Sequence, residues 1–134
     1  MIEIEVVVGK DGTLKACKAS GHAGAGKTGS DIVCAAVSVL MRTAFSVLSN
    51  QEGVVVQCDA LVPGQMYFEA GYEDKKGKDF LFTTGVFLLY GLKSVAREFP
   101  KNCKISVKER IIWHANAAEA AQKTEETQTP NIWE

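Results

Sequence analysis

The sequence has 134 residues, of which 46% are hydrophobic and 23% are charged, and its formal net charge is −1. These values fit one soluble globular domain with its own hydrophobic core, and the charge argues against the basic surface of a nucleic-acid-binding protein. No uninterrupted apolar run approaches the roughly 20 residues of a membrane span, and the acidic start MIEIEVVVG is unlike a signal peptide. We therefore expect a cytoplasmic protein without direct nucleic-acid or membrane partners.

The first third of the chain predicts a β-hairpin, a loop and a helix. Isoleucine and valine alternate with other residues over 2–8, which is the period of a strand. Asp11-Gly12 predicts a hairpin turn, followed by a second, antiparallel strand over 13–20. Residues 21–29 contain four glycines and predict a flexible loop. An apolar face then predicts a helix from Ile32 to about Leu48, capped by Ser30 or Asp31.

The remaining elements are two strands, a helix and a last strand. Strands are expected over 54–61 and 66–72, joined by a turn at Pro63-Gly64. A polar connection over 73–78 leads to a second helix over 79–99, and the last strand covers 104–112. The second helix is apolar nearly all round, so it must be covered on more than one side. The pattern leaves open whether a dimer partner or the same subunit covers it.

The order ββαββαβ predicts a two-layer α+β domain, with a mixed or antiparallel sheet and two helices, over residues 1–113. Residues 114–134 are rich in Ala, Glu, Gln and Thr. We expect them to form an appended tail that is partly disordered.

The cysteines and histidines do not predict a metal site. Cys17, Cys34, Cys58 and Cys103 form no C-x-x-C pair, and the histidines, His22 and His114, are far apart in the sequence. A zinc site is therefore not expected, nor is a disulfide framework in a reducing cytoplasm. Cys17, Cys58 and Cys103 are interpreted as small buried residues in strands.

The glycine-rich loop matches the nucleotide-binding pattern G-x-x-x-x-G-K-[ST] through Gly21, Gly26, Lys27 and Thr28. A phosphate-binding loop of that kind joins a parallel central strand to a helix. Here the preceding strand is the second arm of a hairpin, so we expect the match to be coincidental. Lys27 is then a solvated loop residue.

The same window holds the components of a thiol active site. Cys34 falls in the first turn of the expected helix, where the positive end of the helix dipole favours a thiolate. His22, across the loop, could act as its base and acid, while Asp31 and Ser38 lie three and four residues from Cys34 on the same helix face. From spacing alone, Cys34 as a core residue, Asp31 as an N-cap and Ser38 as a small packing residue remain open.

The blocks GHA at 21–23 and DIVCAAVS at 31–38 resemble the ribosomal-processing cysteine protease family (Prp, YsxB-like). The hairpin and the later ββαβ order agree with the family through about residue 110. The resemblance implies a cysteine endopeptidase without a cofactor, in which Cys34 is the nucleophile and His22 the general base. It also implies that Asp31 and Ser38 support the site.

The family is one of dimeric bacterial proteins that remove a short N-terminal extension from a large-subunit ribosomal protein, number twenty-seven. The resemblance therefore implies a homodimer, a peptide substrate and acyl transfer through Cys34, with the backbone N–H of Cys34 as a candidate oxyanion donor. Two other functions are kept as alternatives. One is a non-catalytic ribosome-associated binding module, and the other is a nucleotide-binding protein using residues 21–28.

Overall fold

The computed structural model describes residues 1–21, 28–62 and 64–110, except for the side chains of residues 28–31, 62 and 110. The expected order ββαββαβ is confirmed. The elements are β1 (Ile2–Gly9), β2 (Leu14–Ser20), α1 (Thr28–Ser49), β3 (Val54–Val62), β4 (Gln65–Tyr72), α2 (Lys75–Glu98) and β5 (Cys103–Arg110). The tail predicted over 114–134, which was expected to be partly disordered, lies outside the described residues.

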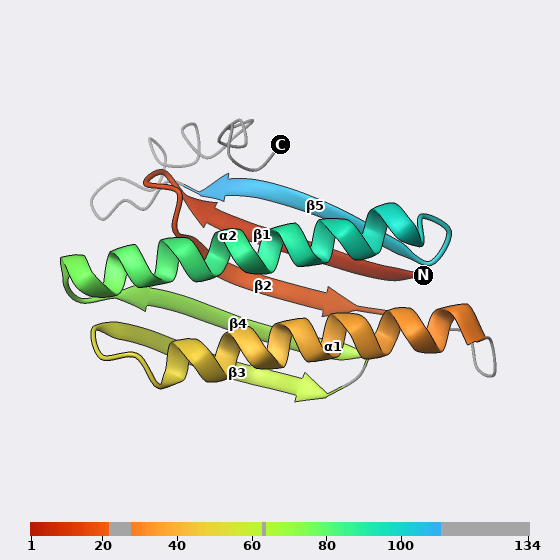
Figure 1. Cartoon of the computed structure of the whole chain (residues 1–134), viewed down its shortest axis with the longest axis horizontal. Helices are drawn as coiled ribbons and strands as arrows, with labels where there is room; N and C mark the ends of the chain where they lie inside the picture. Colours follow the sequence, from red (N-terminus) through yellow and green to blue (C-terminus); the bar gives the residue numbers. More distant parts are fainter. Residues whose placement is uncertain (22–27, 63, 111–134) are drawn as a thin grey trace, which may run out of the picture.

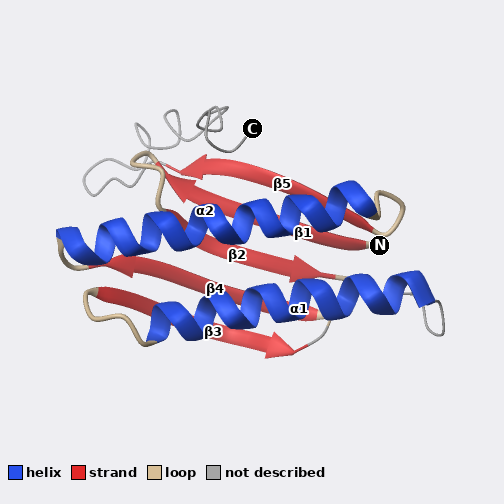
Figure 2. Cartoon of the chain, viewed as in Figure 1, coloured by secondary structure: helices blue, strands red, loops and turns tan. Residues whose placement is uncertain are grey.

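The strands form one mixed sheet in the order β3-β4-β2-β1-β5 (Figures 1 and 2). Strand β1 pairs with β2 in antiparallel and with β5 in parallel orientation, while β4 pairs antiparallel with both β2 and β3. Strand β2, which precedes the glycine-rich segment, is thus antiparallel to both of its neighbours. This is not the parallel strand from which a phosphate-binding loop starts.

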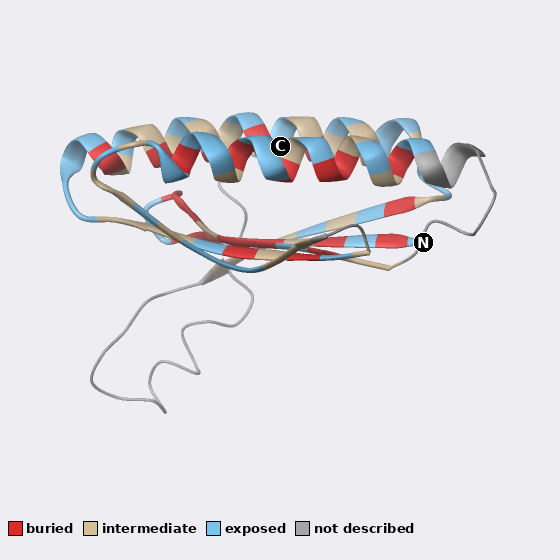
Figure 3. Ribbon diagram, turned by 90° about the horizontal axis from the view of Figure 1, so that it is seen from below, coloured by how far each residue is buried: buried red, intermediate tan, exposed pale blue. Residues whose placement is uncertain are grey.

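Both helices cover the same face of the sheet, and within the described residues the opposite face carries no second layer of helices (Figure 3). Alternate residues of the strands point toward the helices, as the period-two pattern of β1 predicts. The core joins these residues to one apolar stripe of each helix. Its members include Ile4, Val6, Cys17 and Phe68 from the sheet, Val33, Val37, Met41 and Leu48 from α1, and Leu81, Leu88 and Leu92 from α2.

The opposite face of the sheet carries charged and hydroxyl side chains. Glu5 in β1 forms an ion pair with Lys108 in β5 at 3.0 Å. A shallow concavity on this face is lined by Glu3, Ile4, Glu5, Lys18, Ser20, Lys104 and Ser106. Alternation of apolar inward and polar outward residues is what a sheet with one solvated face requires.

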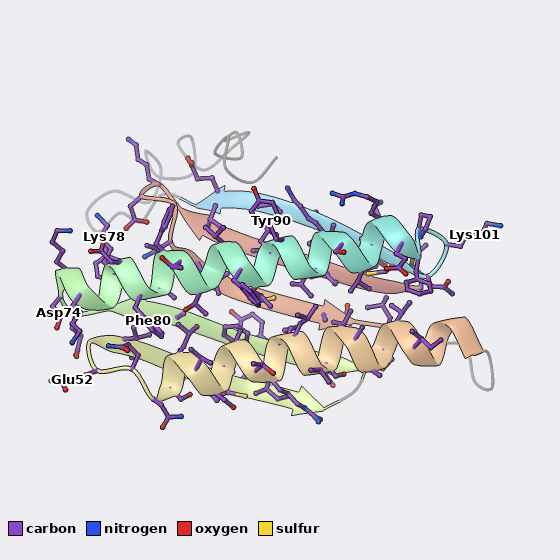
Figure 4. All side chains as sticks on the ribbon, in the orientation of Figure 1. Glu52, Asp74, Lys78, Phe80, Tyr90 and Lys101 are labelled. Carbon is purple, nitrogen blue, oxygen red and sulfur yellow. The ribbon has the colours of Figure 1, made fainter. Side chains whose placement is uncertain are left out.

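Helix α2 begins four residues earlier than the sequence analysis placed it, so the polar connection expected over 73–78 is wrong. The Asp74 carboxylate accepts a hydrogen bond from the Gly77 N–H at 2.7 Å and caps the helix (Figure 4). The cap lets the polar segment 75–79 form the start of the helix instead of a connection. The helix buries one face, while Phe87 is 75% and Tyr90 54% exposed.

By length and composition both helices could cross a membrane, even though no long uninterrupted apolar run marks them in the sequence. The core helix of a soluble protein passes the same test. Here α1 and α2 each place an apolar stripe against the sheet.

A hydrogen-bonded cluster at the β1–β2 hairpin connects it to the end of β4. Asp11 accepts hydrogen bonds from the Thr13 N–H at 3.0 Å, the Thr13 hydroxyl at 2.7 Å and the Tyr72 hydroxyl at 2.7 Å. Desolvation by partial burial raises the pKa of Asp11. These bonds and the charge of Lys15 outweigh it, however, and lower the pKa from 3.8 to about 2.

We expect Asp11→Asn to lower the free energy of unfolding at pH 7 by about 1 kcal/mol, after discounting the shift for solvent screening. Because the folded-state pKa is depressed, this stabilisation is fully present above the unfolded pKa of 3.8 and is lost as pH falls through about 2. Urea unfolding at pH 7 and between pH 4 and pH 2 measures the difference, which should shrink across the acid range. Asp79→Asn, which removes an exposed carboxylate on α2, is the control. A loss of unfolding free energy in Asp11→Asn that does not depend on pH would contradict the electrostatic role of the cluster.

Candidate active site

Helix α1 places Cys34 and Ser38 next to each other, one turn apart, on the edge of the helix that borders its buried stripe. Cys34 is half-buried and packs against the hydrophobic core, whereas Ser38 is only 6% exposed. The buried Ser38 hydroxyl beside a partly accessible thiol marks this edge as a candidate site.

The helix begins at Thr28 and not at Ile32, which changes the setting predicted for Cys34. Cys34 is the seventh residue of α1, past the first four N–H groups that lack an intrahelical partner. The effect of the helix dipole is concentrated in the first turn. The placement of Cys34 in that turn, and with it the case for its N–H as an oxyanion donor, was therefore wrong.

The same extension corrects the expected helix cap. Ser30 and Asp31 were expected before the helix, but both lie inside it. Aspartate is favoured in the first turn as well as at the cap, so its presence alone does not separate the two positions. The side chain of Asp31 lies outside the described residues, and its supporting role stays a prediction.

The backbone that leads to His22 is held at Gly21, directly after β2. The Gly21 N–H donates a hydrogen bond to the Gly64 carbonyl in the β3–β4 turn at 3.2 Å. Gly21 has φ of 113°, and a Cβ at this position would collide with the carbonyl oxygen of Met1. Only glycine fits both requirements. His22 itself, with Lys27 and the rest of residues 22–27, lies outside the described residues, so its role as base stays a prediction.

Sequence reasoning did not single out Arg42, which lies four residues beyond Ser38 on the same edge of α1. Its Nε and Nη2 both donate to the carbonyl oxygen of Leu61, at 3.1 and 2.9 Å. A signal was present, because Arg42 is the only charged residue of the segment Ile32–Ser49 and follows Cys34 at a spacing of eight. The spacing shows a shared helix edge but not the contact with β3.

The four cysteines fall into two groups. Burial raises the pKa of the Cys17 thiol to about 12 and also raises that of Cys103, and both side chains are buried as expected. Cys58 was expected to be buried and is exposed. It lies in β3, the strand at one edge of the sheet, where the pairing with β4 is irregular between Cys58 and Ala60. Cys34 and Cys58 are therefore the thiols that reagents can reach.

Comparisons with known proteins agree with the fold and with the expected cysteine protease family. The sequence model of the family described as cysteine protease Prp matches residues 1–104. No curated protein sequence matches the chain significantly.

The structure also resembles solved structures. SMU.848 from Streptococcus mutans shares 28% sequence identity, with a TM-score of 0.67 over 82% of this chain and 96% of that one. The essential ribosomal processing protease Prp from Staphylococcus aureus, in complex with a substrate peptide, shares 19% identity, with a TM-score of 0.67 over 81% of this chain and 100% of that one. The same protease with a covalently linked product peptide gives 20% identity and a TM-score of 0.64 over the same shares. At 19 and 20% identity, the likeness to the staphylococcal protease shows a common fold.

We expect Gly21→Ala to destabilise the protein by about 1–3 kcal/mol, because alanine is strained at this φ and its Cβ meets the Met1 carbonyl. Thermal unfolding measures the loss. Gly71→Ala in β4 is the matched control, since a Cβ there meets nothing within 4 Å. Equal melting temperatures for the two variants would show that the backbone at Gly21 is not constrained.

Proposed function

The chain belongs to the cysteine protease Prp family, and we propose that it is the endopeptidase that removes the N-terminal extension of a large-subunit ribosomal protein, number twenty-seven. The observation that carries the proposal is the half-buried Cys34 thiol beside the buried Ser38 hydroxyl, inside the region that the family model matches. The staphylococcal relative, which has the same fold, is a ribosomal processing protease. This supports the choice of substrate class.

The proposed chemistry is acyl transfer without a cofactor. The Cys34 thiolate attacks the scissile carbonyl carbon and forms a C–S bond, and His22 donates a proton to the departing amine as the C–N bond breaks. Water, deprotonated by His22, then cleaves the thioester, which releases the carboxylate and restores the thiol. Ser38 offers a buried hydroxyl that can hydrogen-bond within the site, and Asp31 is assigned to orient His22.

Cleavage of the precursor ribosomal protein tests the assignment directly. We expect wild type to make one cut near the N-terminus, and Cys34→Ala and His22→Ala to lower the rate by at least about a thousandfold. Mass spectrometry of the product locates the cut. Cys58→Ala is the matched control, because it removes the other accessible thiol and should leave the rate unchanged.

The outcomes separate this proposal from its alternative. A cut that persists in Cys34→Ala would show that the chemistry lies elsewhere in the chain. No cut by wild type, with the precursor still bound, would favour the non-catalytic ribosome-associated binding module.

The proposal includes a homodimer formed through the outer side of the helix layer. A groove of about 470 Å³ runs between α1 and α2. Its exposed residues are all uncharged. They are Val39, Thr43 and Val47 on α1 with Thr83 and Phe87 on α2. No charged residue occurs over 80–92 of α2. A surface that lacks charged residues and exposes an aromatic side chain is typical of the centre of a protein interface.

A second copy suits this surface because two antiparallel helix pairs can stack as a four-helix bundle. In a symmetric pair the exposed Phe87 ring of each subunit is offered to the helix layer of the other. The same contact would supply the additional cover for α2 that its apolar pattern requires.

We expect Phe87→Asp to convert the dimer to a monomer at micromolar concentration, because an unpaired carboxylate would be buried in the interface. Analytical ultracentrifugation measures the mass. Val55→Asp is the control, since Val55 is 50% exposed on β3 and not part of the groove. A variant Phe87→Asp that stays dimeric would place the interface elsewhere.

The proposal also places the enzyme in the cytoplasm, where its ribosomal substrate is synthesised. All four cysteines are free. A chain with two accessible thiols and no disulfide suits a reducing compartment.

A further inference from the structure

The edge of α1 that carries Cys34 and Ser38 also carries Arg42, and Arg42 contacts a different part of the sheet. Its guanidinium donates twice to the Leu61 carbonyl, near the end of β3. An arginine fork fixed on one oxygen holds that oxygen in both distance and direction. The end of β3 is therefore located relative to the helix of the proposed nucleophile.

Leu61 lies in β3, one residue before the strand ends at the turn that contacts the segment leading to the proposed base. Strands β3 and β4 are in register at Leu61–Met66 and Val62–Gln65, so the connection between them is short. Gly64 lies in this connection with φ of 91°, and its carbonyl accepts the hydrogen bond of the Gly21 N–H. His22 is the next residue in the chain after Gly21.

These contacts form a continuous connection from α1 through Arg42, Leu61 and the β3–β4 turn to Gly21. One end of the connection is the helix of Cys34, and the other is the peptide bond to His22. A nucleophile and its base need mutual placement to within a fraction of an ångström, and a displacement of about 1 Å costs up to a hundredfold in rate.

Resting on the proposed dyad, we propose that Arg42 is a positioning residue. Through the β3–β4 turn it fixes Gly21, the residue before His22, relative to the helix that carries Cys34. Arg42 is exposed, so its hydrogen bonds contribute little to stability compared with the buried stripe of the same helix. Substitution should therefore move the turn without unfolding the domain.

The first experiment compares wild type, Arg42→Ala and Arg42→Lys for cleavage of a peptide that spans the processing site. We expect Arg42→Ala to lower kcat by about tenfold to a hundredfold, with KM changed less than about twofold. Arg42→Lys retains one donor and should recover part of kcat. Arg97→Ala, which removes an exposed arginine from the last turn of α2, is the matched control and should behave as wild type.

The second experiment needs no substrate. In a Cys58→Ala background Cys34 is the one cysteine that is not buried. The rate at which iodoacetamide alkylates Cys34 can therefore be followed against pH. His22→Ala should change this profile, and Arg42→Ala should move it part of the way in the same direction. Melting temperatures of all variants are measured in parallel.

The outcomes distinguish this inference from the proposal on which it rests. If His22→Ala leaves the alkylation profile unchanged, the dyad and the positioning role both fail. If His22→Ala changes it and Arg42→Ala does not, the positioning role alone is overturned. An increase in KM at constant kcat in Arg42→Ala would make Arg42 a substrate contact. A lower melting temperature of this variant at unchanged kcat would make Arg42 a structural residue. Either result overturns the inference.

Discussion

The packing of α1 on the sheet determines the rest of the arrangement. Its stripe of Val33, Val37, Met41, Ala44 and Leu48 is buried against the strands, and this burial fixes the rotation of the helix about its axis. Once the rotation is fixed, Cys34, Ser38 and Arg42 must share the edge toward β3, and Val39, Thr43 and Val47 must line the side toward α2. The proposed catalytic edge and the proposed interface thus follow from one hydrophobic contact and lie on opposite sides of the same helix.

The one-sided sheet explains why two kinds of surface coexist on this small domain. A single layer of helices leaves a polar sheet face on one side and an exposed helix face on the other (Figure 3). The sheet face carries ion pairs such as that between Glu5 and Lys108. The helix face carries no charged residue near Phe87. Contact with another protein surface is therefore more favourable there than contact with water.

The sequence predicted the elements better than their ends. The alternation of β1 and the Asp11-Gly12 turn lead directly to the observed hairpin, because strand period and turn chemistry are local properties. The starts of both helices were placed late, since Ser30, Asp31 and Asp74 are equally compatible with a cap, a first turn or a connection until the surrounding contacts are known. Cys58 was wrongly expected to be buried for a related reason. The alternation of apolar and polar residues along a strand does not reveal that the strand lies at the sheet edge or that its pairing there is irregular. Spacing found Cys34 and Ser38, whereas the contact between Arg42 and Leu61 joins positions 19 residues apart and required the fold.

The position of Met1 has a practical consequence for how this protein is handled. Its carbonyl lies against Gly21, and the Ile2 N–H bonds to Asn102, so the first residues of β1 are enclosed by the backbone that leads to His22 and by the connection before β5. Any residues fused ahead of Met1 start at this crowded point. An affinity tag at the amino terminus would therefore start beside the backbone that leads to the proposed base, whereas a tag added beyond β5 would start from a strand that ends beside Gly9, at the other end of β1.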